Sequence, residues 1–346
     1  MDIVLEIADT FAADHLYAWL LPARQAPYDF SLDPPSNVTS STFSAWQYKP
    51  ATRWMYLEPT DAAFESSWDR DNVVRQLMTL YAITVVFGFL TYFIFASLSY
   101  VFIFDKKILT HPKFLKDQIR LEMLQAIQAM PGMALCTAPM FVLEVRGYAR
   151  LYDTTEEGPG RWYDFAQFPI FILLTDLLIY WIHRGLHHPT IYKRLHKAHH
   201  RWIMPTPYAS HAFHPLDGFA QSLPYHIVPM VIPLNKWAHL GLFIFVNFWS
   251  ILIHDGEYLA DNPVINGSAC HTAHHLYFNY NYGQFTTLWD RWGGSYRKPD
   301  GAWFDKNTKM SETTWRSGIE EMEAIQKQVE GEDDRTYSTE DAKKTN

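Results

Sequence analysis

The chain has 346 residues, of which 48% are hydrophobic, 16% aromatic and 19% charged, a composition too apolar for a disordered protein. It carries 29 lysines and arginines against 37 aspartates and glutamates, a net charge of −8 without a long basic tract, which argues against nucleic acid as a partner. With Cys136 and Cys270 as its two cysteines, it has neither a disulfide framework nor a cysteine-based zinc finger.

Four apolar stretches predict membrane-spanning helices. They cover Leu77–Phe104, Met123–Leu143, Phe165–Ile182 and Trp237–Ile253. The first exceeds the roughly 20 residues that cross a hydrocarbon core, and it contains no charged side chain. A weaker stretch, Phe219–Leu234, contains three prolines and predicts one limb of a hairpin or re-entrant segment. We therefore expect an all-α integral membrane protein with about four transmembrane helices, and not a soluble enzyme with buried helices.

The charges that flank these stretches predict the orientation. Five basic residues lie between the first two spans: Lys106, Lys107, Lys113, Lys116 and Arg120. The positive-inside rule places this loop in the cytosol, so that the third span delivers His183 to the cytosolic face. The sequence Lys343-Lys344-Thr345-Asn346 resembles a dilysine retrieval signal. We expect a multi-pass protein of the endoplasmic reticulum membrane, with its active site and C-terminus in the cytosol.

Four segments follow from this pattern. Residues 1–75 form a luminal N-terminal segment, and 76–162 hold the first two spans and their loops. Residues 163–304 hold the third and fourth spans and the histidine clusters, which form a helical cap on the cytosolic side. Residues 305–346 are a polar cytosolic tail, in which Ser317 opens a short helix to about Val329. The rest of the tail is expected to be solvated.

Histidine is the most unevenly distributed residue type. Of 16 histidines, all but His15 and His111 lie between positions 183 and 275. Three clusters have similar spacing: His183, His187 and His188; His196, His199 and His200; and His271, His274 and His275. Residues at i, i+3 and i+4 share one face of a helix, so the rings of each cluster are expected to converge.

Nine converging imidazoles predict a metal centre, because without a cation they would repel one another on protonation and leave buried nitrogens unpaired. Nine ligands exceed what one first-row metal accepts, so we expect two metal ions. His254 lies at the end of the fourth span, and we expect it to be a tenth ligand because of this position. His214 is a candidate ligand, or a candidate to hydrogen-bond a ligand. Asp176, two turns before His183, is a candidate acceptor for a ligand N–H or a helix-packing residue.

Iron is the metal that this ligand set favours. Structural zinc sites are four-coordinate and often use thiolates, whereas imidazole suits iron and its oxygen chemistry. Attack on an unactivated C–H bond beside lipid requires O₂ and a redox metal, since no side chain performs it. We therefore expect two iron ions with O₂ as co-substrate.

The histidine clusters resemble those of the membrane fatty-acid-hydroxylase superfamily. Within it, five stretches resemble the sterol C-5 desaturases: Tyr180–Pro189, Leu195–His200, Pro205–Gly218, Ile253–Gly256 and Tyr280–Tyr296. The resemblance implies a catalytic domain within 163–304 that converts Δ7-sterols to Δ5,7-sterols in ergosterol-type biosynthesis. It also implies that the nine clustered histidines hold two irons, and that cytochrome b5 and its NAD(P)H-dependent reductase supply electrons.

Several alternatives remain open from the sequence. A sterol C-4 methyl oxidase or a lipid hydroxylase would use nearly the same clusters. A histidine-rich metal transporter or a haem-binding membrane protein would place its ligands inside the spans, whereas most histidines here lie outside them. Trp202, Tyr208 and Phe213 are candidates to line a sterol channel, with packing or interface anchoring as equal alternatives.

Overall fold

The computed structural model describes residues 1–23, 46–258, 261–305, 307–309 and 311–338. The β-strands in these ranges are β1 (Leu151–Tyr152) and β2 (Leu234–Asn235), two residues each, which pair in parallel. The prediction of an all-α protein is therefore confirmed. The dilysine sequence expected to act as a retrieval signal lies outside the described residues.

Among the described residues, three helices are long and apolar enough to cross a membrane. They are α3 (Val73–Phe102), α4 (Gln118–Leu143, extended by a π-helical turn at Glu144–Tyr148) and α5 (Arg161–Leu186). The Asn72 side chain begins α3 by accepting the backbone N–H groups of the first turn, which otherwise lack partners. α3 then runs for 30 residues, about 45 Å of helix.

The fourth expected span is a helix but a short one. α9 (Lys236–Leu252) has 17 residues, or about 26 Å, less than the hydrocarbon core of about 30 Å. The proline-containing stretch expected to be re-entrant is a continuous helix, α8 (Pro215–Val231), with Pro224 and Pro229 inside it. The structure thus provides three spanning helices and two shorter ones beside them.

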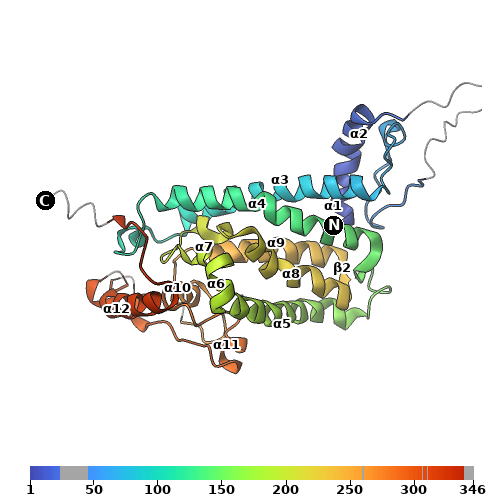
Figure 1. Ribbon diagram of the computed structural model, residues 1–346. Coiled ribbons are helices and arrows are strands. Elements are labelled where there is room, and N and C mark those ends of the chain that lie inside the picture. Colours follow the sequence, from blue (N-terminus) through green and yellow to red (C-terminus); the bar gives the residue numbers. More distant parts are fainter. Residues whose placement is uncertain (24–45, 259–260, 306, 310, 339–346) are drawn as a thin grey trace, which may run out of the picture.

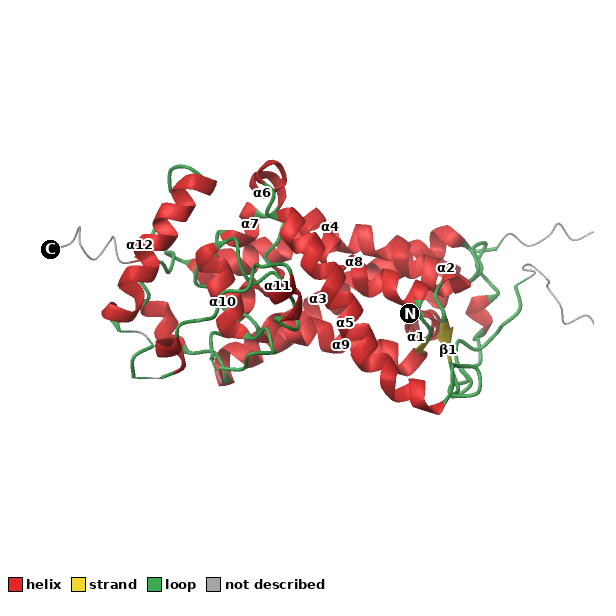
Figure 2. Ribbon diagram, turned by 90° about the horizontal axis from the view of Figure 1, so that it is seen from below, coloured by secondary structure: helices red, strands yellow, loops and turns green. Residues whose placement is uncertain are grey.

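Helices α3, α4, α5, α8 and α9 run lengthwise through the molecule, and the other elements gather toward the two ends of this bundle (Figures 1 and 2). One end holds α6 (Pro189–Leu195), α7 (Lys197–His200), α10 (Ser268–Tyr277), α11 (Leu288–Trp292) and α12 (Glu312–Val329). The other end holds α1 (Asp2–Ala8) and α2 (Asp14–Leu20), joined by a π-helical turn at Asp9–Ala13. Short 3₁₀ helices cover Asp61–Ala63, Lys106–Thr110, Pro207–His211 and Gly301–Phe304.

Buried ion pairs attach the N-terminal helices to the start of α3. Arg75 lies within 2.9 Å of Asp9 and also pairs with Asp14, which in turn pairs with Arg70. All four side chains are buried. A buried charge is tolerated when it is paired and hydrogen-bonded, so this network orients α1 and α2 against the end of the bundle.

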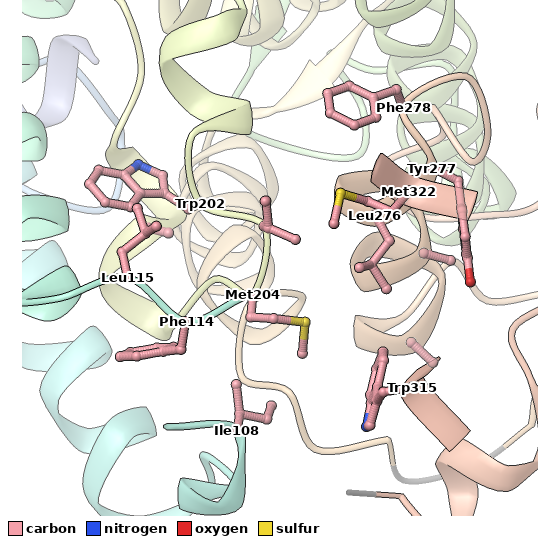
Figure 3. Packing of buried hydrophobic residues seen from close by; sticks show 14 of the residues in the cluster. Ile108, Phe114, Leu115, Trp202, Met204, Leu276, Tyr277, Phe278, Trp315 and Met322 are labelled. Carbon is pink, nitrogen blue, oxygen red and sulfur yellow. The ribbon is translucent and has the colours of Figure 1, made fainter. Parts of the chain in front are cut away.

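The largest core cluster lies at the histidine end and includes α12 (Figure 3). It joins Ile108 and Phe114 of the first loop to Trp202, and to Trp315 and Met322 of α12. The first loop, with its basic residues, is therefore at the same end of the molecule as the histidines.

The short helix expected in the polar tail is α12, which is longer than predicted and packs into the core. The helix begins at Glu312, because the side chain of Ser311 accepts the backbone N–H of Thr314, and not at Ser317. Its apolar stripe places Trp315 and Met322 in the core, with 3% and 0% of their surfaces exposed. The charges that made this segment look solvated occupy the opposite face.

Replacing Trp315 by Ala should destabilise the histidine end by about 3–5 kcal/mol, the usual cost of truncating a buried Trp. Its ring stacks on Trp303 at a centroid distance of 4.9 Å. The measurement is the thermal unfolding midpoint of the detergent-solubilised protein. Trp162→Ala, which removes a side chain that is 90% exposed, is the matched control. Equal midpoints for the two variants would contradict the docked position of α12.

Candidate metal centre

Nine histidines from four segments converge into two groups at one end of the helical bundle. The first group contains His183, His187, His196, His200 and His274. The second group contains His199, His254, His271 and His275. Within each group, one candidate ligand nitrogen per residue lies within 4.8 Å of all the others. These are the dimensions of two neighbouring sites for metal ions.

The two groups interlock through consecutive residues. His199 and His200 are neighbours in α7 but belong to different groups, and so do His274 and His275 in α10. Successive residues on a helix point about 100° apart, since one turn takes 3.6 residues. Each short helix therefore supplies both groups, and the rings of His200 and His275 have centroids only 4.9 Å apart.

The nitrogen–nitrogen separations fit coordination of a metal. Four pairs of Nε2 atoms face each other: His183–His196 at 3.2 Å, His200–His274 at 3.0 Å, His254–His271 at 2.9 Å and His271–His275 at 3.1 Å. Imidazole nitrogens lie about 2.0–2.1 Å from a bound metal, so adjacent ligands are about 3 Å apart. His271 Nε2 faces two other Nε2 atoms, and one N–H proton cannot satisfy both contacts. A cation at the centre can.

Acceptors behind the rings orient the Nε2 atoms inward. The Nδ1 atoms of four rings each have an oxygen partner: His183 with the Tyr282 carbonyl at 2.9 Å, His274 with the Tyr280 carbonyl at 2.7 Å, His254 with the Ser250 carbonyl at 2.7 Å, and His196 with Asp217 Oδ2 at 2.8 Å. Such contacts fix the tautomer and the ring direction of metal-binding histidines. The donor set therefore fits two metal ions.

The carboxylate behind the ligands is Asp217, which the sequence prediction missed. Asp217 is fully buried and also accepts a hydrogen bond from the Gln221 amide at 2.9 Å. Asp176, the predicted candidate, instead accepts the backbone N–H groups of residues 284–286 at 2.8–3.0 Å. Its role is structural. The sequence contains one indication that Asp217 belongs to the site. It lies three residues after His214, inside a stretch that resembles the sterol C-5 desaturases.

His188 lies outside both groups. Pro189 follows it, and the backbone of His188 is extended (φ −61°, ψ 133°), as expected before proline. The side chain is exposed, and its Nδ1 is 2.6 Å from Thr190 Oγ1. We therefore leave His188 out of the proposed ligand set.

His214, the other candidate ligand from the sequence, also lies outside both groups, and so does His226. His214 caps α8 by accepting the backbone N–H of Leu216. His226 packs edge-on against Phe141 in the bundle. His254, which the sequence analysis predicts as a tenth ligand, is in the second group.

The segment after α12 makes hydrogen bonds to the backbone at His200, a member of the first group. Arg335 donates from Nη2 to the carbonyl of His200 at 3.0 Å and from Nε to that of Arg201 at 3.1 Å. Its guanidinium pairs with the buried carboxylate of Glu330 at 2.8 Å, which accepts the Tyr192 hydroxyl at 2.7 Å. The part of the chain expected to be a solvated tail thus fixes the backbone at His200.

The surroundings keep the rings neutral. Burial, reinforced by neighbouring imidazoles, lowers the pKa of five rings well below the ordinary value of 6.5: His187, His199, His200, His271 and His275. A neutral imidazole has a free lone pair, and a protonated one does not. The site is therefore prepared to bind cations at neutral pH.

Comparison with known proteins places these residues within a family. A family model described as fatty acid hydroxylase matches residues 168–295, which include both histidine groups. A probable Delta(7)-sterol 5(6)-desaturase of Neurospora crassa is 64% identical over 345 residues, covering 100% of both chains.

Other relatives carry the same description. A Delta(7)-sterol 5(6)-desaturase of Gibberella zeae is 59% identical, over 98% of this chain and 97% of its own. One from Candida albicans is 46% identical, over 97% of this chain and 99% of its own. No solved structure matches the chain.

Acid should destabilise the metal-free protein. Burial lowers the pKa of His254 to about 4 and that of His274 to about 3, whereas both titrate near 6.5 in an unfolded chain. Below about pH 6.5 the unfolded chain therefore binds more protons, so this stability is complete above that pH and is lost as the pH falls toward 3. The measurement is the unfolding midpoint of chelator-treated protein from pH 7.5 to 4.5. A midpoint that stays constant across this range would contradict the neutral, buried rings.

Replacing Asp217 by Asn should weaken metal binding by about 10- to 100-fold, the usual effect of altering an acceptor behind a ligand. The measurement is metal content after dialysis against graded chelator. Asp164→Asn is the matched control, because Asp164 lies at the opposite end of α5, where it accepts the hydroxyls of Tyr152 and Thr155. Equal metal affinity in the two variants would remove Asp217 from the site.

Proposed function

This chain belongs to the fatty acid hydroxylase family, among the Δ7-sterol 5(6)-desaturases, and we propose that it introduces the C5–C6 double bond into Δ7-sterols. The observation that carries the proposal is the pair of interlocked histidine groups beside an apolar cavity in a membrane protein. The products are Δ5,7-sterols, as in ergosterol-type biosynthesis.

The proposed cofactor is a pair of iron ions held by the nine convergent histidines. Iron supplies the O₂-dependent oxidation that no side chain can perform on an unactivated C–H bond. The sterol gives up two hydrogens, a donor gives two electrons, and with two protons O₂ is reduced to two waters. The chain's own part is to present neutral imidazoles, to hold them with Asp217 and the carbonyls behind them, and to bury the site.

The substrate would occupy a cavity between α3, α4, α8 and α9. The empty space in and around it is about 1010 Å³, which includes space open to the surroundings. Apolar side chains such as Phe87, Met130 and Phe243 line it, as a sterol requires. Of the aromatic residues expected to line a channel, Phe213 lines the cavity, whereas Trp202 is in the core cluster.

Tyr208 is not a lining residue of the cavity. Its ring packs beside Tyr92 and Tyr100, with centroid distances of 6.2 and 5.6 Å. Its hydroxyl donates to Ser97 Oγ at 3.1 Å. The alternative of packing is thus the better description of Tyr208.

The electron donor would approach the histidine end. We propose that this end, which also carries the basic first loop, faces the cytosol in the endoplasmic reticulum membrane. Cytochrome b5, reduced by an NAD(P)H-dependent reductase, would then deliver electrons from the water, while sterol enters from the bilayer. The arrangement keeps the two reactants on different sides of the metal centre.

Replacing His199 or His274 by Ala should abolish desaturation, because each change removes a proposed ligand from a different group. The measurement is sterol profiling by mass spectrometry in yeast that lacks its own C-5 desaturase and expresses the variant. His188→Ala is the matched control: it removes a histidine from the same region but from outside both groups, and should leave the product level unchanged.

Two outcomes would contradict the proposal. Δ5,7-sterols at the control level in either ligand variant would remove the paired metal centre. Δ7-sterols that persist with the unaltered chain, shown by immunoblotting to be present in the membrane fraction, would favour a sister hydroxylase acting on another lipid.

A further inference from the structure

One polar cluster in the cavity belongs to neither histidine group. His211, Ser210 and Asn247 all line the cavity, which is otherwise mostly apolar. Ser210 Oγ lies 3.0 Å from His211 Nδ1, and the Asn247 side chain is a further hydrogen-bond partner of the ring. The Asn247 amide is itself oriented by donating to the Phe243 carbonyl at 2.7 Å. Polar groups oriented in this way in an apolar pocket typically set the position of a ligand.

The cluster lies at the end of the cavity that meets the second histidine group. Phe213, two residues after His211, lines the cavity and stacks on the His199 ring at a centroid distance of 4.2 Å. Ser250, one turn after Asn247, also lines the cavity, and its carbonyl accepts from His254 Nδ1 at 2.7 Å. The polar cluster and the proposed metal ligands therefore share a wall.

His211 is neutral and partly accessible from the cavity. Burial lowers its pKa to about 4, against a smaller opposing effect of the Asn247 hydrogen bond. The ring nevertheless keeps intermediate exposure, because it borders the cavity. Ser210 and Asn247 hold the ring in one orientation at the cavity wall, and the Ser210 hydroxyl can make a further hydrogen bond, since a hydroxyl has one donor and two acceptor positions.

The chemistry of a Δ7-sterol places its one polar group close to the reacting carbons. The hydroxyl oxygen on C3 is three bonds from C5 and four from C6, or about 4–5 Å at C–C bonds of about 1.5 Å. When C5 and C6 face the metal centre, the hydroxyl must therefore lie at the same end of the cavity. The remaining rings and the side chain are apolar and fit the rest of it.

We propose that His211, with Ser210 and Asn247, binds the 3-hydroxyl of the sterol and thereby sets C5 and C6 before the second histidine group. This inference rests on the proposed function and names the substrate group that its site recognises. His211 is then a residue that contacts substrate, in contrast to the metal-binding histidines around it.

The test compares a Δ7-sterol with its 3-deoxy analogue, using enzyme in yeast microsomes. The unaltered enzyme should favour the 3-hydroxy substrate in kcat/KM by about tenfold or more, because loss of the hydroxyl leaves buried polar groups unpaired. His211→Ala should lower kcat/KM for the 3-hydroxy substrate by about tenfold and reduce the preference to near unity. His211→Gln, which retains an N–H donor, should restore part of the preference.

His226→Gln is the matched control. His226 lines the same cavity, but it is farther along α8 than the polar cluster. The helix begins at Pro215, four residues after His211, and His226 lies eleven residues further on, about 16 Å along the helix. This variant should keep the preference for the 3-hydroxyl. Metal content, measured on the purified variants, should equal that of the unaltered protein in both His211 variants.

Three results would overturn the inference: an undiminished preference in His211→Ala, loss of the preference in His226→Gln, or loss of metal from His211→Gln. Failure of the proposed function is a separate result, since the unaltered chain would then form no Δ5,7-sterol from the 3-hydroxy substrate.

Discussion

The need to keep nine buried imidazoles neutral and oriented is the constraint on which the rest of the structure depends. Protonated rings at nitrogen separations near 3 Å would repel one another in a medium of low dielectric constant. Neutral rings with their lone pairs inward create the opposite situation, a negative local potential that favours a cation. The burial that makes the rings weak bases therefore also makes them metal ligands.

Orientation of the rings is supplied by a chain of contacts that begins far from them. The carboxylates of Asp176 and Asp290 bind the backbone of the segment that follows α10: Asp176 takes the N–H groups of residues 284–286, and Asp290 those of Tyr282 and Gly283. This backbone in turn presents the Tyr282 carbonyl to His183. A spanning helix thus positions a ligand through its own aspartate and a loop that is distant in sequence.

Helical spacing within the sequence predicted which histidines converge, because that information is local. It could not predict their division into two groups, since consecutive residues such as His199 and His200 separate only when α7 docks between α5 and α10. His188 lies outside both groups for a local reason, which is the extended backbone that Pro189 imposes. Asp217 was missed because its contact with His196 joins residues 21 positions apart. The burial of α12 was hidden by its charged outer face, although Trp315 and Met322, seven residues apart, mark an apolar stripe.

The position of the proposed metal centre at one end of the bundle suits two reactants of opposite polarity, an apolar sterol and a water-soluble electron donor. In the proposed function, a sterol would reach the site through the apolar cavity between the helices, whereas electrons would come from a water-soluble donor domain. A centre in the middle of the membrane would be closed to the donor, and one in a detached soluble domain would require the sterol to leave the bilayer. The candidate spans therefore do more than anchor the protein: residues of α3, α4 and α5 line the cavity, and His183, in the last turn of α5, is the point at which a candidate span meets the proposed metal centre.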